Sequence, residues 1–465
     1  MNSVTEADVA KLIEIAGEEN VSTRTADLDA HSIDESWFPP HPADVIVWPS
    51  STEQVAAIVG YANQRKLPVV AWSGGSSLEG NPVPVVGGIL LAMYRMKAIL
   101  DIREQDLQVV VQPGIIYDDL NTALGKKGLF FPPAPGSADV ATIGGMVANN
   151  SSGMRAVKYG VTRHYVLKLK VVLADGSVIT VGSNAKKSAS GYDLVSLFVG
   201  SEGTLGIVTE VTLRLMGLPE QTAAVVASFE AMEDATGVVY DAISGGLDPS
   251  AIEILDETTI AVTNQRQGLA LREEPTLFVE FHGNEAAIEE QLEFLRELCE
   301  DHGCLAFDQA TNTEARNKLW VARKEAHDSI KESHPGKTMI SGDVCVPMSC
   351  FGEMVHFVHQ VSERTGLIIY VFGHAGDGNL HTEAIVDRQV EGEYELGLAA
   401  TDEIVNHALE VGGTASGEHG VGLGKRQFML TEHGDSLAVM RIIKQTLDPN
   451  GILNPGKIFP DSLGA

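Results

Sequence analysis

The pattern of apolar and polar residues changes near residue 218, and this change limits the fold more than any single motif does. Before it, a buried strand at 44–49, a capped helix from Ser51 and a second strand at 67–72 form a β-α-β unit, the usual start of a nucleotide-type site. A chain of 465 residues also exceeds the length that one hydrophobic core can support. We therefore expect at least two domains.

The second part of the chain follows a different pattern, in which half-buried strands alternate with well-formed helices. Strands are expected at 223–229 and 277–281, and a helix at 285–302. Two further strands, at 368–374 and 380–385, meet at a Gly-Asp-Gly-Asn turn and so form a hairpin. This order indicates an α+β domain with helices on one side of an antiparallel sheet.

Composition is that of an ordinary globular protein, with 44% hydrophobic and 21% charged residues, but the formal net charge is −30. An acidic surface of that size repels phosphates, which argues against nucleic acid or an anionic membrane as a partner. No apolar run of about 18 residues could span a bilayer, and the acidic N-terminus lacks the pattern of a secretory signal. The four cysteines lack zinc-site spacing and are few for a disulfide scaffold, so we expect reduced thiols in a cytoplasmic protein.

Two short glycine-rich segments near the C-terminus carry the residues with the most chemistry. They supply His374 and His381 from the hairpin, and Glu418 with a further imidazole at His419. Two imidazoles and one carboxylate are typical of a divalent metal with an open coordination position, and zinc, manganese and iron fit such a set comparably. The alternative, a pair of hairpin histidines that hydrogen-bond locally, stays open at this point.

Three glycine- and serine-rich regions lie in the first part of the chain, interleaved with expected strands. Small residues allow successive backbone N–H groups to surround an anion, and hydroxyls add donors, so a pyrophosphate is the expected guest. Neither a Walker P-loop nor a G-x-G-x-x-G Rossmann fingerprint is present. The regions are 73–80, then 135–137 with 142–145 and 149–153, then 200–206.

These regions and several other short segments resemble the flavoproteins of the vanillyl-alcohol oxidase / para-cresol methylhydroxylase superfamily. Within it, the chain is most similar to the FAD-linked D-2-hydroxy-acid dehydrogenases, in particular the D-lactate dehydrogenase (cytochrome) group. The matching segments follow the family's order from about residue 40 to the end of the chain. They are 76–80, 142–145, 157–160, 190–194, 200–206, 373–381, 417–420 and 454–457.

The resemblance implies an α+β fold with a two-part FAD-binding domain of the para-cresol methylhydroxylase type and an α+β cap domain with an antiparallel sheet. We expect the FAD-binding domain at 1–217, the substrate or cap domain with the metal site at 218–424, and a C-terminal segment at 425–465 that returns to the FAD domain. The resemblance also assigns the residues that bind FAD. They are Ser73, Gly74, Gly75, Ser76, Ser77, Pro135, Gly136, Thr142, Gly144, Gly145, Asn149, Ser152, Gly153, Glu202, Gly206, Val208 and Asn454.

For catalysis, the resemblance implies His374, His381 and Glu418 as metal ligands. His419 would be the base, and Arg323 would bind the substrate carboxylate. The expected reaction is the oxidation of a D-2-hydroxy acid, most simply D-lactate, to the 2-oxo acid, with the hydroxyl proton going to an imidazole and the hydride to flavin. The electrons would pass to a non-nicotinamide acceptor, namely a cytochrome, a quinone, an electron-transfer flavoprotein or a ferredoxin.

Several alternatives remain. Glycolate or D-2-hydroxyglutarate could be the substrate, although the lysine that 2-hydroxyglutarate enzymes carry for the second carboxylate has no counterpart near Ser341. A metal-dependent hydrolase and a flavin-binding module without redox turnover are the candidates from other classes. A homodimer and a peripheral membrane location, reached through the electron acceptor, are left open.

Overall fold

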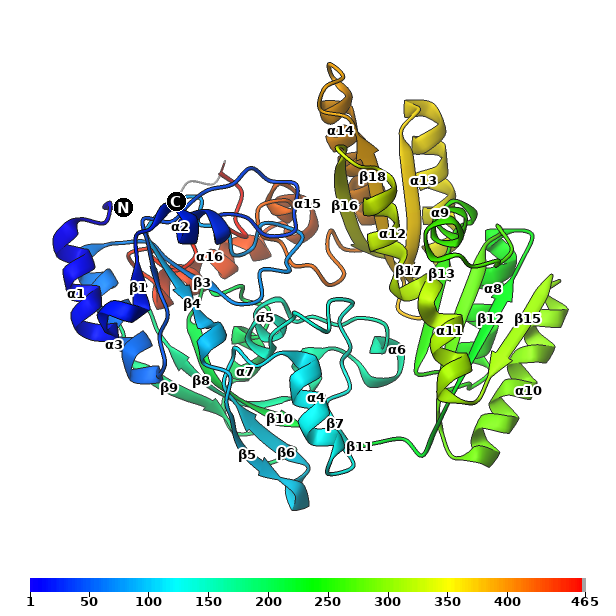
Figure 1. The fold of residues 1–465 in the computed structure, drawn as a ribbon, viewed down its shortest axis with the longest axis horizontal. Coiled ribbons are helices and arrows are strands. Elements are labelled where there is room, and N and C mark those ends of the chain that lie inside the picture. Colours follow the sequence, from blue (N-terminus) through cyan, green and yellow to red (C-terminus); the bar gives the residue numbers. More distant parts are fainter. Residues whose placement is uncertain (462–465) are drawn as a thin grey trace. The chain divides into compact units, whose positions relative to one another are not determined.

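The structure is a computed structural model that describes residues 1–461. Its backbone contacts divide the chain into two compact units (Figure 1). Unit 1 contains Met1–Ser152, Val161–Leu218 and the residues from Glu418 onward, and unit 2 contains Gly153–Gly160 and Pro219–Gly417. The domain limits expected from the sequence, at residues 217 and 424, remain a prediction.

A four-stranded sheet with three helices forms the first part of unit 1. Its elements are α1 (Glu6–Ala16), β1 (Val21–Ser22), α2 (Thr25–Ala30), β2 (Val45–Val47), α3 (Thr52–Arg65), β3 (Val69–Trp72) and β4 (Ile89–Ala92). The sheet order is β1-β2-β4-β3, and β4 pairs in parallel with both β2 and β3. The expected β-α-β unit therefore forms with a third strand inserted, and Ser51 caps α3 by accepting from the Gln54 N–H at 3.3 Å.

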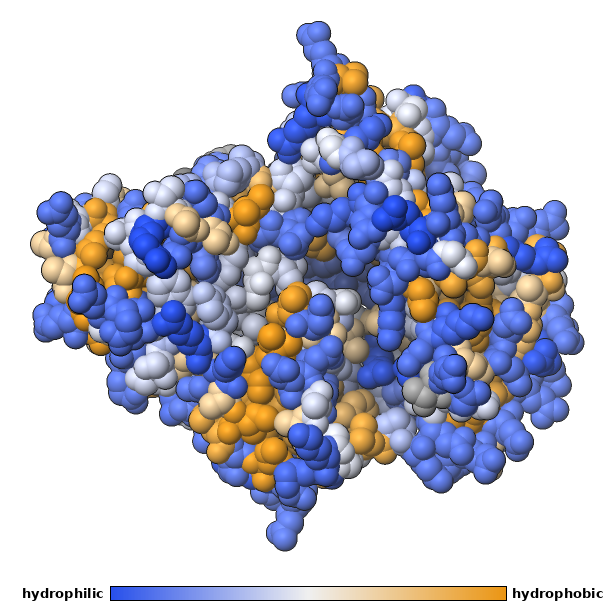
Figure 2. Space-filling view, in the orientation of Figure 1, coloured by the Kyte–Doolittle hydropathy of each residue, from blue (hydrophilic) through white to orange (hydrophobic). Residues whose placement is uncertain are grey.

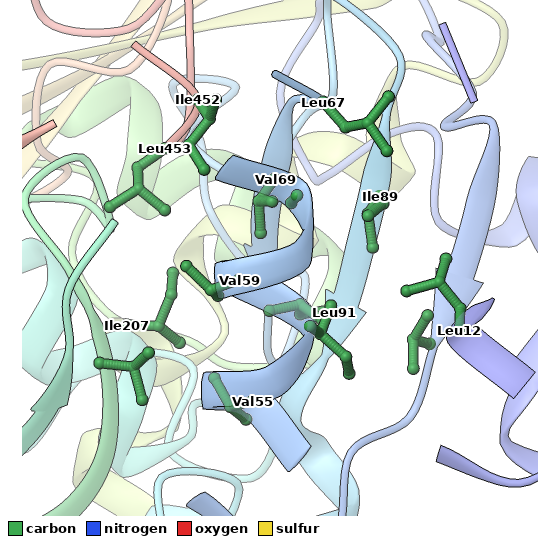
Figure 3. Packing of buried hydrophobic residues seen from close by; sticks show 14 of the residues in the cluster. Leu12, Val55, Val59, Leu67, Val69, Ile89, Leu91, Ile207, Ile452 and Leu453 are labelled. Carbon is green, nitrogen blue, oxygen red and sulfur yellow. The ribbon is translucent and has the colours of Figure 1, made fainter. Parts of the chain in front are cut away.

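The core of this part packs α3 against the sheet (Figure 3). Val55 and Val59 repeat at helical spacing on the buried side of α3, because positions four apart lie on one face of a helix. The C-terminal part of the chain joins the same core through Ile452 and Leu453. The Ile452 carbonyl accepts from the Val69 N–H at 2.8 Å, which fixes this segment beside β3.

A five-stranded antiparallel sheet in the order β5-β6-β10-β8-β9 forms the rest of unit 1, with short helices around it. The strands are β5 (Ile99–Arg103), β6 (Gln108–Val111), β7 (Leu129–Phe130), β8 (Val166–Val172), β9 (Val178–Gly182), β10 (Ile207–Arg214) and β11 (Met216–Gly217). The helices are α4 (Tyr117–Gly125), α5 (Ile143–Asn149), α7 (Leu194–Phe198), α15 (Met429–His433) and α16 (Ser436–Leu447). Strands β7 and β11 pair separately as a two-stranded ribbon.

Unit 2 is built on a seven-stranded antiparallel sheet in the order β15-β12-β14-β13-β17-β18-β16. Its strands are β12 (Gln221–Ser228), β13 (Ala251–Leu255), β14 (Thr276–Gly283), β15 (Ala306–Ala310), β16 (Thr338–Cys345), β17 (Ile368–His374) and β18 (Asn379–Val386). Its helices are α6 (Ala156–Tyr159), α8 (Met232–Ser244), α9 (Glu257–Gln267), α10 (Glu285–Asp301), α11 (Thr313–Lys324), α12 (Ala326–Ser333), α13 (Phe351–Thr365) and α14 (Glu393–Glu410). The expected hairpin at 368–385 is confirmed as β17 and β18.

Helices cover both faces of this sheet, so the expectation of helices on one side is wrong (Figure 1). On one face lie α9, α11 and α12, where the ring of Trp320 packs edge-on against Phe278 at 6.3 Å. Helices α10, α13 and α14 contact the sheet from the other side. The physical reason is that every residue of β18 is buried, and a strand that is buried on both faces needs cover on both.

The surface in view is mainly hydrophilic, with small apolar patches (Figure 2). This agrees with the formal net charge of −30, most of which must lie in contact with water. Among the helices of residues 1–461, none has both the length and the apolar character that a bilayer crossing requires.

Candidate active site

The first glycine loop of unit 1 leaves no space for side chains at two of its positions. It follows β3, and a Cβ placed on Gly74 would lie 2.5 Å from the carbonyl oxygen of Val140. Gly75 has a φ of +72°, and a Cβ there would lie 2.7 Å from the ring of Trp72. Only glycine fits such positions, so the loop presents backbone rather than side chains.

A second loop is tied directly to the first. The hydroxyl of Ser73 hydrogen-bonds the hydroxyl of Thr142, which also caps α5 by accepting from the Gly145 N–H at 3.2 Å. At Gly144, a Cβ would lie 2.6 Å from Cβ of Pro113. The two loops therefore form one cradle of backbone groups and hydroxyls, which is the kind of surface that binds a pyrophosphate.

The remaining predicted FAD residues of these loops differ in burial. Ser76, Ser77 and Asn149 are half-buried, Pro135 is buried and Gly136 is exposed. Their contact with a cofactor remains a prediction.

Two of the predicted residues fix the segment that contains Glu418 and His419. The amide of Asn149 donates to the carbonyl oxygen of His419 at 3.0 Å, and the hydroxyl of Ser152 donates to the carboxylate of Glu418 at 2.8 Å. Nε2 of His419 lies 3.6 Å from the carboxylate of Glu418. Gly153, with a φ of +92°, begins the segment that belongs to unit 2. Unit 1 thus holds the predicted base and the predicted carboxylate ligand next to each other.

Glu202 lies in a buried network. Its carboxylate accepts from the amide of Asn81 at 2.7 Å and from the backbone N–H groups of Val421 and Gly422 at 2.7 and 2.9 Å. Burial raises the pKa of Glu202, and these hydrogen bonds offset part of that effect. The amide of Asn454 donates to the Glu202 carbonyl at 2.7 Å. The predicted residues Glu202 and Asn454 are therefore brought together.

The last two predicted FAD residues lie where β10 begins. A Cβ on Gly206 would lie 2.5 Å from Cγ1 of Val171, so the backbone approaches its neighbour closely there. Val208 is half-buried on β10. Together with the cradle, the residues present fit an FAD cofactor, because the close approaches at glycine occur in the segments assigned to it.

In unit 2, His374 and His381 are neighbours on one face of the sheet. His381 pairs with Phe372, and His374 pairs with Asn379, so the two imidazoles lie diagonally across the β17–β18 hairpin. Their Nε2 atoms are 3.3 Å apart, and both side chains are buried. Two nitrogens bound at about 2.0–2.1 Å to a tetrahedral ion lie about 3.3–3.4 Å from each other. The pair therefore fits a metal site.

Glu253 of β13 contacts His374 at the ring nitrogen that does not face His381. Both of its carboxylate oxygens lie 2.8 Å from Nδ1 of His374, and its side chain is fully buried. A carboxylate at Nδ1 holds the proton there and leaves Nε2 with the lone pair that a metal requires. Glu253 is not among the residues predicted from the sequence, although a single carboxylate in the apolar strand Ala251–Leu255 is an available signal.

Arg323 of α11 shares the same carboxylate. Its Nε donates to Glu253 at 2.6 Å, and its guanidinium lies 5.2 Å from the centre of the Phe372 ring. Within residues 1–461, Nε is its one nitrogen with a protein hydrogen-bond partner. The structure thus brings Arg323 to the histidine pair, with the two Nη groups available to a ligand.

Asp343 of β16 lies on the other side of the pair, with Oδ1 3.7 Å from Nδ1 of His381. It also accepts from the hydroxyl of Ser416 at 2.8 Å. Ser416 is two residues before Glu418, so the chain that leads to Glu418 is anchored near His381. The boundary between the units falls directly before Glu418, and its binding to the same ion as the histidines remains a prediction.

A groove of about 940 Å³ in unit 2 contains none of the predicted site residues. It lies between α9, α12 and the start of β17, where Tyr370 and His334 form part of its lining. The hydroxyl of Tyr370 hydrogen-bonds Nε2 of His334 at 2.9 Å. The groove is large enough for a ligand but lacks the paired imidazoles.

Comparison with known protein families gives two matches that together cover most of the chain. Residues 43–182 match the family described as FAD binding domain. Residues 218–458 match the family described as FAD linked oxidases, C-terminal domain.

Curated relatives align over nearly the whole chain. The mitochondrial D-lactate dehydrogenase [cytochrome] of Arabidopsis thaliana is 41% identical over 90% of this chain and 73% of its own length. A probable mitochondrial D-lactate dehydrogenase of Danio rerio is 37% identical over 97% of this chain and 91% of its own. The glycolate oxidase subunit GlcD of Bacillus subtilis is 36% identical, covering 97% of this chain and 96% of its own.

Solved structures show the same fold at lower identity. p-Cresol methylhydroxylase with substrate bound superimposes with a TM-score of 0.83 at 17% identity, covering 99% of both chains. The 4-ethylphenol oxidase of Gulosibacter chungangensis, in an isoeugenol complex, gives a TM-score of 0.81 at 21% identity and the same coverage. The fold expected from the sequence is confirmed.

Proposed function

Because this chain belongs to the FAD-linked oxidases, close to D-lactate dehydrogenases and GlcD, we propose that it oxidises a D-2-hydroxy acid, with D-lactate as the first candidate, to the 2-oxo acid. The chain is an FAD-dependent oxidoreductase, which removes the metal-dependent hydrolase from the alternatives. Two of the relatives described above are named as D-lactate dehydrogenases, and this supports D-lactate over other acids.

The observation that carries the proposal is the buried set of His374, His381 and Glu253 on the sheet, with Arg323 reaching Glu253 from helix α11. A 2-hydroxy acid presents a hydroxyl next to a carboxylate, and this set offers a place for each. The imidazole pair suits a cation that binds the hydroxyl, and the guanidinium suits the carboxylate. Both groups are needed on one substrate, which distinguishes a 2-hydroxy acid from a simple alcohol.

Arg323 would bind the substrate carboxylate through its two Nη groups, since Nε is held by Glu253. Glu253 fixes the guanidinium in place before substrate arrives, so little side-chain entropy is lost on binding. Because the same carboxylate orients His374, one buried residue positions both the carboxylate-binding and the hydroxyl-binding group. We assign Glu253 as a positioning residue.

The proton and the hydride of the C2 carbinol would leave separately. A divalent cation held by His374, His381 and Glu418 would supply stabilisation of negative charge on the C2 oxygen. FAD would supply the acceptor for the hydride. His419 would accept the hydroxyl proton, and its neighbour Glu418 would favour the imidazolium that results. Zinc, manganese and iron suit two imidazoles and a carboxylate comparably.

Glycolate is the second candidate substrate, because GlcD of Bacillus subtilis aligns over nearly all of both chains. Glycolate differs from D-lactate by the loss of one methyl group, so the same arginine and cation would bind it. The reduced flavin would pass its electrons to a cytochrome, quinone, electron-transfer flavoprotein or ferredoxin. The name of the Arabidopsis relative, which includes a cytochrome, favours the first of these.

The test is anaerobic reduction of the flavin in the purified holoenzyme, followed at the flavin absorbance band by stopped flow. D-lactate, L-lactate, glycolate and D-2-hydroxyglutarate are each mixed with enzyme before and after treatment with a chelator. We expect D-lactate to bleach the flavin fastest and chelation to abolish the reaction. An enzyme that retains its flavin but is bleached by none of these acids would instead be the flavin-binding module without redox turnover.

A further inference from the structure

Next to the histidine pair, the same face of the unit 2 sheet carries a second polar row. Glu383 of β18 pairs with Ser341 on one side and with Tyr370 on the other. His381 lies two residues earlier on β18, in the row that contains Asp343. Residues two apart on a strand share a face and lie about 6.6 Å apart. The sheet thus presents a carboxylate one step beyond the proposed metal ligands.

The carboxylate of Glu383 is held rigidly and is nearly inaccessible, with 2% of the residue exposed. The hydroxyl of Ser341 donates to one oxygen at 2.7 Å, and Nδ1 of His327 lies 3.0 Å from the other. Burial, the largest single effect, lowers the pKa of His327, but the hydrogen bond to Glu383 and the charges of Glu383 and Asp328 together raise it above its usual value. These contacts fix the orientation of the carboxylate at the second row.

Two residues on the helices that cover this part of the sheet contact these two carboxylates. Arg323 at the end of α11 reaches Glu253, and His327 on α12 reaches Glu383. The two residues are four apart in sequence and lie on consecutive helices, on either side of Glu325. Glu383 lies about 6.6 Å along β18 from His381, which is within reach of a polar group on C4 or C5 of a ligand whose hydroxyl is at His381.

We propose that Glu383 determines substrate specificity by rejecting 2-hydroxy acids that carry a second carboxylate, and this inference rests on the proposed function. Two carboxylates brought together in a buried site repel each other strongly, because little water screens them. A short side chain such as the methyl group of lactate does not reach the second row. The structure thereby gives a positive reason for excluding a dicarboxylate, in addition to the missing lysine near Ser341.

The first experiment needs no variant. Wild-type holoenzyme is given D-2-hydroxyglutarate and its 5-methyl ester, which has the same chain without the second charge. We expect kcat/KM for the ester to exceed that for the acid at least tenfold, since the charge and not the length is rejected. Equal use of the two compounds, or preference for the acid, overturns the proposal, and preference for the acid would indicate that His327 acts as a receptor for the second carboxylate.

The second experiment changes the charge of the residue. Glu383→Gln keeps the size and the Ser341 contact, so the ratio of kcat/KM for D-2-hydroxyglutarate to that for D-lactate should rise at least tenfold. Ser341→Ala is the matched control, since it removes a hydrogen bond from the same carboxylate but leaves the charge, and the ratio should stay within threefold. A rise of similar size in both variants would show that packing decides specificity and would overturn the proposal.

Product binding separates this inference from the proposed function. Isothermal titration calorimetry of the oxidised holoenzyme with pyruvate and with 2-oxoglutarate measures the affinity for each product without turnover. We expect Glu383→Gln to strengthen binding of 2-oxoglutarate relative to pyruvate at least tenfold, and an unchanged ratio overturns the role of Glu383. If wild-type enzyme neither oxidises these acids nor binds these products, the proposed function is wrong and the inference is lost with it.

Discussion

Two of the histidine–carboxylate clusters in unit 2 are made of similar groups, but their surroundings differ. In one, His359 of α13 lies near Asp256 and Glu257, with Nε2 3.1 Å from Asp256. Asp256 is already used as the cap of α9, because it accepts from the N–H of Thr259 at 2.8 Å and from the hydroxyl of Thr258 at 2.9 Å. Most of the hydrogen bonds that Asp256 accepts therefore stabilise the start of α9.

In the other cluster, the carboxylate of Glu253 orients the imidazole of His374. Glu253 binds Nδ1 of His374, which turns Nε2 towards the second imidazole of His381 at 3.3 Å. Both histidines are buried, whereas the side chain of His359 is 30% exposed. Residue type alone therefore does not decide which cluster is the better candidate for a metal site. What distinguishes the two clusters is whether the carboxylate orients a ligand or caps a helix.

The largest expected effect comes from the same substitution in each cluster. His381→Gln should lower kcat for D-lactate by about a thousandfold or more, because losing a metal ligand removes several kcal/mol of charge stabilisation. His359→Gln should change kcat less than about threefold, since His359 contacts the cap of α9 and not the histidine pair. Steady-state kinetics with an artificial electron acceptor, at equal flavin content, measure both. Similar losses in the two variants would remove the distinction between the clusters.

Metal content gives a second comparison. Elemental analysis after gel filtration should find about one divalent ion per chain in wild type and in His359→Gln, and much less in His381→Gln. Chelation of wild-type enzyme should abolish flavin reduction by substrate while the flavin absorbance remains. Addition of zinc, manganese or iron should restore reduction. Full activity in a metal-free preparation would contradict the assignment of the imidazole pair.

A smaller effect is expected from the residue behind the ligand. Glu253→Gln should lower metal affinity or kcat about 10- to 100-fold, because outer-shell partners of a ligating histidine contribute that much. It should also raise KM, since Arg323 loses the carboxylate that fixes it. Glu257→Gln, the matched change in the other cluster, should alter neither quantity. Metal titration and KM values test this together, and an unaffected metal affinity would reduce Glu253 to an ion-pair partner of Arg323.

The sequence predicts well what depends on local structure. Gly74 and Gly144 have no room for a side chain, and glycines clustered in a short loop are themselves a signal of such a close approach. His374 and His381 come from one hairpin, and the spacing of its strands places them together. The approach of Arg323 follows only from the family resemblance, because helix α11 lies 70 residues from Glu253 in sequence.

The sequence does not reveal the partners that act over long separations. Glu253 is 121 residues from His374, and nothing in either segment indicates their pairing. Glu383 is one of four polar residues in the strand Asn379–Val386, and nothing distinguishes it until the register places it beside Ser341, 42 residues away. The sequence also does not show that helices cover both faces of the sheet. Whether a strand is buried on one face or both depends on helices that are distant in sequence.

The smallest expected effect concerns stability and pH, and it tests the structural cluster alone. The hydrogen bond to Asp256 raises the pKa of His359, with burial opposing and the charges of Asp256, Glu257 and Glu363 adding to the increase. A histidine whose pKa is raised by folding stabilises the folded state fully below its unfolded pKa of about 6.5. That stabilisation is lost as the pH rises through the folded pKa.

His359→Gln should therefore lower Tm at pH 6 by no more than about 3 °C, because Asp256 keeps its hydrogen bonds from Thr258 and Thr259, and the difference from wild type should be smaller at pH 9. Thermal denaturation of both proteins at the two pH values measures this. A difference that grows with pH would mean that neutral His359 makes the stabilising contact. If added zinc also raised Tm in wild type but not in His359→Gln, this cluster would bind metal as well, and capping of α9 by Asp256 would not suffice to prevent it.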